Sequence, residues 1–194
     1  MERKSTEERQ KEIKTAVLQI IGDEGIKSVS TKNIAKHTGL SEGAIFRHFK
    51  TKRDIMISII DDVDKDMIDK LEQISLEDIS ARKRLFKVIC KAISYLTKHN
   101  GITILLFTEA SQANDIEMIE ILNNLFNSQT QVIAKIIKDG IDEGIWSKDI
   151  SAEDVAILYM GIPITHNIRL ILTKRKPDKN FCERIMQLFE RMLN

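Results

Sequence analysis

Thr-Lys-Asn-Ile-Ala-Lys-His-Thr-Gly-Leu-Ser-Glu-Gly-Ala-Ile-Phe-Arg-His-Phe, residues 31–49, is the stretch that decides the fold. Its pattern predicts two short helices joined by a tight turn. Gly39 stands where the chain must turn left-handed, which glycine does without steric cost. Hydroxyl residues open each helix and are expected to cap it: Thr31 the first and Ser41 the second. Ile45 and the phenylalanine four residues later share one inward face. This combination predicts a helix-turn-helix.

The outward surface of the second helix favours DNA binding. Its first turn, residues 42–44, contains a glycine and an alanine, so the helix end can approach base edges, and its free amides suit a phosphate. Cationic side chains that suit phosphate oxygens follow, namely Arg47, His48, Lys50, Lys52 and Arg53. The alternative is a structural hairpin with a solvated charged face. DNA binding requires that Gly43 and Ala44 do not pack inside the protein. Glu42 either accepts from a cytosine amino group or repels phosphate.

Residues from about 10 to 56 resemble the DNA-binding domain of the tetracycline-repressor-like (TetR) family of transcriptional regulators. The resemblance rests on residues 25–31, 34–35 and 38–52. It implies that Thr31, His48 and Lys52 hold phosphates, and that residues 42–44 face bases. The family usually has a tyrosine where this chain has Phe46, so the phosphate contact of that hydroxyl is lost here. The expected DNA-binding residues are Thr31, Lys32, Ser41, Glu42, Gly43, Ala44, Phe46, Arg47, His48 and Lys52.

The charge of the chain is unevenly distributed, although the whole carries only +1. Residues 1–54 hold 12 Lys and Arg against 8 Asp and Glu, whereas the remainder holds 18 against 21. The basic excess therefore coincides with the DNA-binding motif. We expect no signal peptide or membrane span, because no run approaches the ~18 apolar residues required, and therefore a cytoplasmic protein. Cys90 and Cys182 lack metal spacing and predict buried thiols rather than a disulfide framework; a redox role is the alternative.

The rest of the chain predicts more helices separated by short polar breaks, and Asp115 opens the longest of these stretches, which reaches Glu143. A long fourth helix begins near Lys52, directly after the DNA-binding motif, and is capped by Thr51. We therefore expect an all-α protein of about nine helices, in two domains. Residues 1–51 form the three-helix DNA-binding domain, and residues 52–194 form a helical domain for effector binding and dimerisation. The resemblance supplies this architecture but identifies no ligand.

The last two predicted helices carry the argument for a dimer. The helix from Ser151 to about Thr173 is apolar on two sides, so that its own core can cover only one of them. The final helix is expected to begin at Asp178 and has an apolar stripe at helical spacing. A homodimer that buries both helices as a four-helix bundle is preferred over a monomeric core that covers both sides, and the family architecture implies the same. The residues expected in the interface are Met160, Ile164, Ile168, Phe181, Ile185, Leu188 and Met192.

The sequence shows no grouping typical of an enzyme. The four histidines are scattered, no Gly-rich phosphate loop is present, and nothing pairs the acids for catalysis, so we expect no metal and no cofactor. An effector is implied by the resemblance. Pro163 would kink its helix, which either makes room for a ligand or only fits the helices together. His166 serves either packing or ligand recognition. The effector-site residues expected are Met67, Phe107, Tyr159 and His166.

These observations predict a transcriptional repressor. As a homodimer it would bind double-stranded DNA at a palindromic operator, with half-sites ~34 Å or more apart. The apolar inner surfaces predict a lipophilic or amphipathic small molecule as the effector that releases it. Ligand binding would tilt the fourth helix and separate the DNA-binding heads. The alternative is a DNA-binding regulator with a sealed core, controlled by a protein partner or by no ligand.

Overall fold

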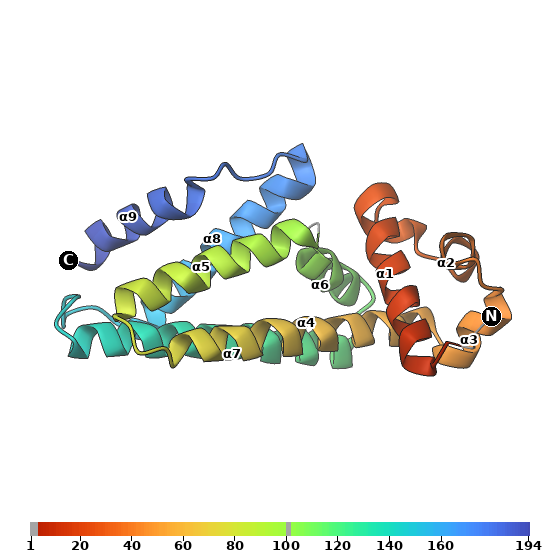
Figure 1. Ribbon diagram of the computed structural model, residues 1–194, viewed down its shortest axis with the longest axis horizontal. Helices are drawn as coiled ribbons and strands as arrows, with labels where there is room; N and C mark the ends of the chain where they lie inside the picture. Colours follow the sequence, from red (N-terminus) through yellow and green to blue (C-terminus); the bar gives the residue numbers. More distant parts are fainter. Residues whose placement is uncertain (1–3, 100–101) are drawn as a thin grey trace. The chain divides into compact units, whose positions relative to one another are not determined.

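The computed structural model describes residues 4–99 and 102–194, and this part of the chain is helical and contains no strand (Figure 1). Nine α-helices and one short 3-10 helix follow each other along it. They are α1 (Thr6–Glu24), η1 (Ile26–Ser28), α2 (Thr31–Thr38), α3 (Glu42–His48), α4 (Lys52–Ser75), α5 (Ala81–Lys98), α6 (Ile102–Gln112), α7 (Ile116–Asp142), α8 (Ala152–Thr173) and α9 (Phe181–Leu193). The predicted all-α fold class is confirmed.

The chain divides into two compact units. Unit 1 comprises Met1–Val63 and Ile102–Ile119, and unit 2 comprises Asp64–Gly101 and Glu120–Asn194. Helices α4 and α7 each begin in unit 1 and continue into unit 2. The units therefore do not follow the functional division expected at residue 51, because α6 and the first part of α4 group with the helix-turn-helix. That division remains a prediction about function.

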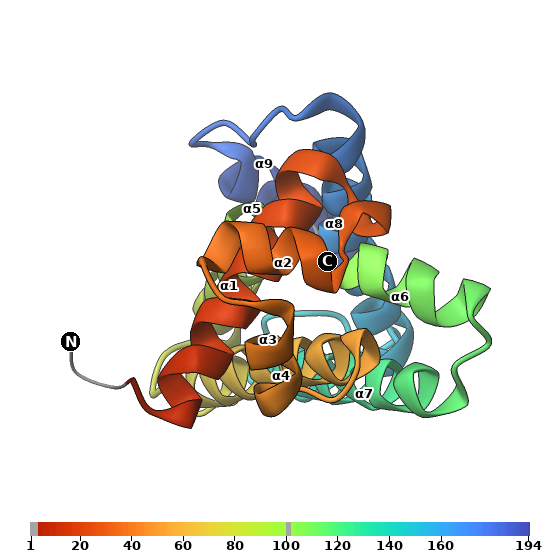
Figure 2. The same cartoon turned by 90° about the vertical axis from the view of Figure 1, so that its right-hand side faces the viewer.

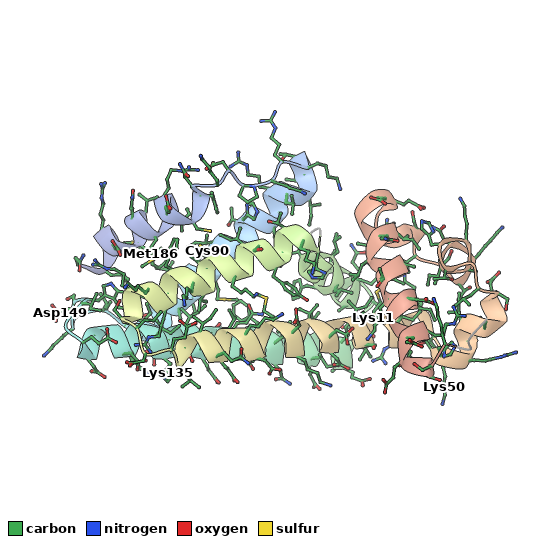
Figure 3. The ribbon with its side chains drawn as sticks, in the orientation of Figure 1. Lys11, Lys50, Cys90, Lys135, Asp149 and Met186 are labelled. Carbon is green, nitrogen blue, oxygen red and sulfur yellow. The ribbon has the colours of Figure 1, made fainter. Side chains whose placement is uncertain are left out.

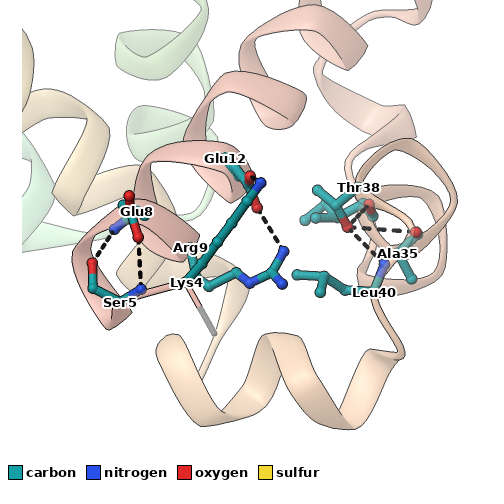
Figure 4. Close-up of polar contacts among 9 residues, drawn as sticks. Lys4, Ser5, Glu8, Arg9, Glu12, Ala35, Thr38 and Leu40 are labelled. Carbon is teal, nitrogen blue, oxygen red and sulfur yellow. Dashed lines mark hydrogen bonds and ion pairs between the residues drawn. The ribbon is translucent and has the colours of Figure 1, made fainter. Parts of the chain in front are cut away.

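Helix α1 provides the core against which the motif packs. Its start is a capping box, in which Ser5 Oγ accepts from Glu8 N and the Glu8 carboxylate accepts from Ser5 N (Figure 4). Arg9 donates to Glu12 one turn further on, at 2.8 Å. Gly25 ends the helix with φ +89°, a conformation that strains other residues. The inward side is Ile13, Ala16, Val17, Ile20 and Ile21, all buried.

The turn between α2 and α3 is held by Gly39 and by one hydroxyl group. Gly39 has φ +68°, as its position predicted. Thr38 Oγ1 donates to Ile34 O at 2.9 Å and accepts from Leu40 N at 3.3 Å (Figure 4). This hydroxyl satisfies backbone groups that the end of α2 would leave unpaired. The predicted cap of α3 is confirmed, since Ser41 Oγ accepts from Ala44 N.

The predicted cap of α2 is wrong by one residue. Ser30, not Thr31, is the N-cap, and its Oγ accepts from Asn33 N at 3.2 Å. Thr31 is instead the first helical residue, which leaves its hydroxyl available for another partner. The predicted cap of α4 is confirmed, because Thr51 Oγ1 accepts from Asp54 N while the Asp54 carboxylate accepts from Thr51 N.

The side chain of Arg84 is a buried cation in the core of unit 2. Arg84 on α5 donates to Ser75 O at 2.8 Å, to Asp139 at 2.6 Å and to Glu143 at 2.7 Å. The guanidinium thereby links the end of α4 to the last turns of α7. Trp146, just after α7, lies directly against Gly140, where no side chain would fit. Both contacts fix the C-terminal end of α7 inside unit 2.

Helix α8 corrects one expectation from the sequence. By length and composition it is a helix that could cross a membrane, whereas we expected no sufficiently long apolar run. One side of α8 packs inside unit 2, where the Tyr159 hydroxyl donates to Leu85 O and its ring meets Phe189 edge-on at 5.1 Å. We therefore interpret α8 as a core helix that also carries an exposed apolar side. Pro163 is buried within it, and the helix continues past that residue.

Candidate nucleic-acid interface

The N-terminal end of α3 is exposed in unit 1, and Figure 2 shows this short helix after α2 along the chain. Ser41, Glu42 and Gly43 are exposed, and Ala44 is half-buried. A Cβ added to Gly43 would meet no atom within 4 Å. Ile45, by contrast, is 1% exposed, so the helix is anchored by its inward side while its first turn stays open. This is the arrangement that an approach to base edges requires.

Two of the predicted DNA-binding residues contact each other. Thr31 Oγ1, at the start of α2, donates to Glu42 Oε2, at the start of α3, at 2.7 Å. Glu42 also lies at the N-terminal end of its helix, where the helix dipole favours a negative group. The contact joins the beginnings of the two motif helices on the exposed surface.

The side chains that follow on α3 divide between solvent and core. Phe46 is half exposed, and Arg47 is exposed together with Lys50 just beyond the helix. Among the residues that the structure describes, no ion partner is found for Arg47 or Lys50. His48 is half-buried: its carbonyl oxygen accepts from Gln10 at 3.2 Å, and its Nδ1 is buried without a hydrogen-bond partner.

The two cations at the start of α4 are paired with carboxylates of unit 1. Lys52 Nζ lies 3.1 Å from Glu109 Oε1 on α6. Arg53 donates to both oxygens of Asp115, at 2.5 and 2.8 Å, and to Glu117 at 2.6 Å. The Arg53 hydrogen bonds, more than the bond from Met118 N, lower the pKa of Asp115, and the acidic partners raise the pKa of Arg53. These ion pairs connect the segment directly after the motif to α6 and to the start of α7.

Sequence reasoning missed this set of acids. Glu109 and Asp115 lie 57 and 62 residues beyond their partners, and no local pattern links them. The available signal was limited to Asp115 as the opening residue of a predicted helix. The structure confirms that local role, because Asp115 Oδ1 accepts from Met118 N at 3.1 Å.

The four residues expected at an effector site have different surroundings. Phe107 belongs to unit 1 and is exposed. Met67 and Tyr159 are buried in unit 2. His166 is buried as well, with Nε2 at 3.4 Å from Thr97 Oγ1 and its ring 5.3 Å from that of Phe181. Burial, and then the charge of Arg169, lowers the pKa of His166. The observed contacts of His166 are thus ring packing and a hydrogen bond.

An apolar strip is exposed on α8 and α9. Leu188 and Met192 on α9 are 61% and 54% exposed, and Ile164 and Ile168 on α8 lie open as well. The strip continues on α8 through Ile157, Leu158 and Leu172. Phe181 and Ile185 are half-buried at its edge. Met160, which we expected in the interface, is buried in unit 2, because at 100° per residue it falls beside Ala156 and Asn167.

Comparison with known families identifies both parts of the chain. Residues 13–59 match the model described as bacterial regulatory proteins of the tetR family. Residues 45–166 match the model described as the C-terminal region of YsiA-like protein.

Individual relatives agree with these matches. The fatty acid metabolism regulator protein of Bacillus subtilis (strain 168) is 28% identical over 129 residues, which are 66% of this chain and 66% of that protein, slightly under two thirds. The nucleoid occlusion factor SlmA of Vibrio cholerae is 23% identical over 68% of this chain and 67% of that protein. Among solved structures, the transcriptional regulator FadR of Bacillus subtilis in complex with stearoyl-CoA has the same fold. Its TM-score is 0.75 at 21% identity, covering 94% of this chain and 96% of that one.

Proposed function

This chain belongs to the TetR family of bacterial regulatory proteins, and from this premise we propose that it is a dimeric repressor released from a palindromic operator by a lipophilic effector. It is a transcriptional regulator and not an enzyme. We further propose that it acts in the cytoplasm. The observation that carries DNA recognition is the open first turn of α3, where Gly43 is exposed and a Cβ would meet no atom.

The proposed docking places the first turn of α3 in the major groove. The residues proposed to contact bases lie in that turn, and phosphates are assigned to the surrounding polar and cationic groups. Phe46 supplies ring contact without a hydroxyl. The proposed set is Thr31, Lys32, Ser41, Glu42, Gly43, Ala44, Phe46, Arg47, His48 and Lys52.

The proposed switch runs through the beginning of α4. Helices α4 and α7 extend from unit 1 into unit 2. The Lys52–Glu109 ion pair connects the start of α4 with α6, and the Arg53–Asp115 ion pair connects it with the start of α7. An effector that binds unit 2 and shifts either helix would therefore act on the segment that carries the motif. To do so it must bind the released state more tightly, and a tenfold preference supplies about 1.4 kcal/mol per site.

A long-chain acyl thioester is the effector class that we propose to test first. The fatty acid regulator among the relatives and the stearoyl-CoA complex among the similar structures support this choice. The buried side chains of unit 2 are mainly Ile, Leu, Val and Met, which suits an acyl chain. Of the effector residues expected from the sequence, Met67, Tyr159 and His166 all lie in unit 2 and stay in the proposal. Phe107, which lies in unit 1 and is exposed, stays a prediction from the sequence.

The experiment is a titration of the whole protein on a duplex that carries the sequence upstream of its own gene. Fluorescence anisotropy should show specific binding, with Arg47→Ala and Gly43→Glu as variants that lose it. Stearoyl-CoA should then weaken the binding, whereas CoA without the acyl chain should not. Binding that neither variant weakens would overturn the DNA interface. Specific binding that stearoyl-CoA leaves unchanged would reject this effector and favour the alternative function, a regulator with a sealed core.

A further inference from the structure

The two cysteines of the chain meet inside unit 2. Cys90 lies on α5 and Cys182 in the first turn of α9, 92 residues later, and both residues line the same pocket. Cys182 shares a side of α9 with Met186, Phe189 and Leu193, at spacings of three and four residues, and these three residues are buried. Figure 3 shows Cys90 and Met186 on the adjoining sides of α5 and α9. The thiol pair therefore lies where α9 packs onto its own protomer.

The pair is accessible to small solutes. Both cysteines line a pocket of about 500 Å³, together with Ile93, Ser94, Thr97, Lys98, Lys176 and Pro177. Each thiol is half-buried. A small oxidant that enters the pocket is therefore next to both cysteines, which distinguishes this pair from an isolated buried cysteine.

We propose that Cys90 and Cys182 form a redox-sensitive pair, which a hydroperoxide converts into a disulfide between α5 and α9. In the first step one sulfur attacks the peroxide, the O–O bond breaks, and the sulfur becomes a sulfenic acid while water leaves. In the second step the other sulfur attacks the sulfenic sulfur, the S–O bond breaks, and a second water carries away the remaining thiol proton. In total, two thiols and one hydrogen peroxide give one disulfide and two waters.

The surroundings assign an order to these steps. Burial, followed by the hydrogen bond and charge of Cys182, raises the pKa of Cys90 to about 12. Because the thiolate is the reacting form, Cys90 is a poor first nucleophile. Cys182 is therefore the residue that takes the oxygen, and Cys90 is the resolving thiol, held beside it by the packing of α9.

The disulfide would fix the position of α9. This helix carries Leu188 and Met192 on its exposed side, so its docking controls an apolar strip of the surface. Closing a loop of about 90 residues restricts the unfolded chain and should raise the melting temperature by roughly 5–10 °C. The chemistry itself does not depend on DNA binding, so it can fail or succeed independently of the proposed function.

The test is oxidation of the whole protein with hydrogen peroxide, followed by blocking of free thiols with N-ethylmaleimide. The expected product is a single chain without the label, which carries two labels again after reduction with dithiothreitol. Trypsin should release residues 88–91 joined to residues 180–184. Cys90→Ser should stop the oxidation of Cys182 at the sulfenic acid, and Cys182→Ser should leave Cys90 largely reduced.

Three results would overturn the proposal. One is a disulfide between two copies of the chain in place of the internal one. Another is full labelling of both thiols after peroxide, and a third is sulfinic acid at either cysteine of the wild type without any cross-linked peptide. Because the peptide is mapped in the wild-type protein, none of these outcomes depends on whether a variant folds.

Discussion

At the scale of single residues, a substitution at Gly43 should weaken DNA binding without lowering the stability of the fold. Its missing side chain leaves open space in the free protein, so Gly43→Ala adds a methyl group that meets no protein atom. Alanine also favours a helix over glycine by ~0.5–1 kcal/mol. We expect an unchanged or higher melting temperature and at least about tenfold weaker binding to the operator duplex, because the methyl group would occupy space beside the bases. Calorimetry and anisotropy measure the two effects, and unaltered affinity would place this turn outside the groove.

Gly140 shows the opposite behaviour, because its missing side chain is required by the fold. A Cβ at this position would lie 2.2 Å from two ring atoms of Trp146 and 3.1 Å from Ala81. Gly140→Ala should therefore lower the free energy of unfolding by about 1–3 kcal/mol. Gly161→Ala is the matched control, since it too is in a helix but meets nothing within 4 Å. Urea denaturation compares the two, and equal stability of both variants would contradict this account.

At the scale of elements, the contacts of Arg84 hold the ends of α4, α5 and α7 together. Its side chain is 8% exposed, and it pairs with Asp139 in the last turn of α7 and with Glu143 directly after that helix. Arg84→Met keeps the apolar stem but leaves the Ser75 carbonyl and two carboxylates without this donor. We expect a loss of about 2–3 kcal/mol in the free energy of unfolding at pH 7, measured by urea denaturation. If the variant were as stable as the wild type, the interactions of Arg84 would do no more than offset the free-energy cost of removing its charge from water.

The same contact predicts a dependence on pH. Burial alone would raise the pKa of Asp139, but the hydrogen bonds from Lys135 and Arg84 outweigh it and hold the pKa below the ordinary value of 3.8. A carboxylate with a lowered pKa in the folded state stabilises the protein above its unfolded pKa, and this stability is lost as pH falls through the folded pKa. The difference in stability between wild type and Arg84→Met should therefore narrow below about pH 4. A difference that stays constant from pH 7 to pH 3 would exclude this linkage.

Local signals account for what the sequence predicted about the elements. Ser41, Gly39 and Thr51 act through neighbours within three or four residues, so their roles were visible in the chain. The α2 cap was misplaced by one residue because Ser30 and Thr31 have equivalent hydroxyls in sequence. The α9 start was placed three residues too early, at Asp178, which instead accepts from Asn180 N and Arg184 in the preceding turn. Contacts such as Arg84–Asp139, 55 residues apart, have no local signature.

At the scale of the whole molecule, the exposed strip on α8 and α9 predicts the oligomeric state. We expect twice the 22.3 kDa mass of one chain in solution. Leu188→Glu combined with Ile168→Glu should yield a monomer with an intact helical spectrum, because two charges would have to be buried at the interface. Leu76→Glu is the matched control, as Leu76 is 75% exposed but lies outside α8 and α9. Sedimentation velocity decides the matter, and a monomeric wild type would refute the dimer.

The family could be predicted from the sequence, but the effector could not. The DNA-binding motif is contiguous, and its turn and caps constrain the residue types at each position. An effector site depends on side chains from distant helices, and of the expected residues Tyr159 is occupied by a hydrogen bond to Leu85 O. Of the expected interface residues, Met160 is buried, and no stripe pattern resolves its position at the border of the buried side. The other interface residues stay a prediction.

The hydrogen bond between Thr31 and Glu42 has a consequence for how a sequence is discriminated. Thr31 has a single hydroxyl proton, which it donates to the Glu42 carboxylate in the protein without DNA. A phosphate oxygen can only accept, so in the proposed docking a phosphate that binds this hydroxyl removes it from Glu42. The released carboxylate is repelled by the duplex unless a cytosine amino group donates to it. The phosphate contact of Thr31 and the recognition of one base by Glu42 are thereby linked. A base other than cytosine at this position would therefore also weaken the adjacent phosphate contact.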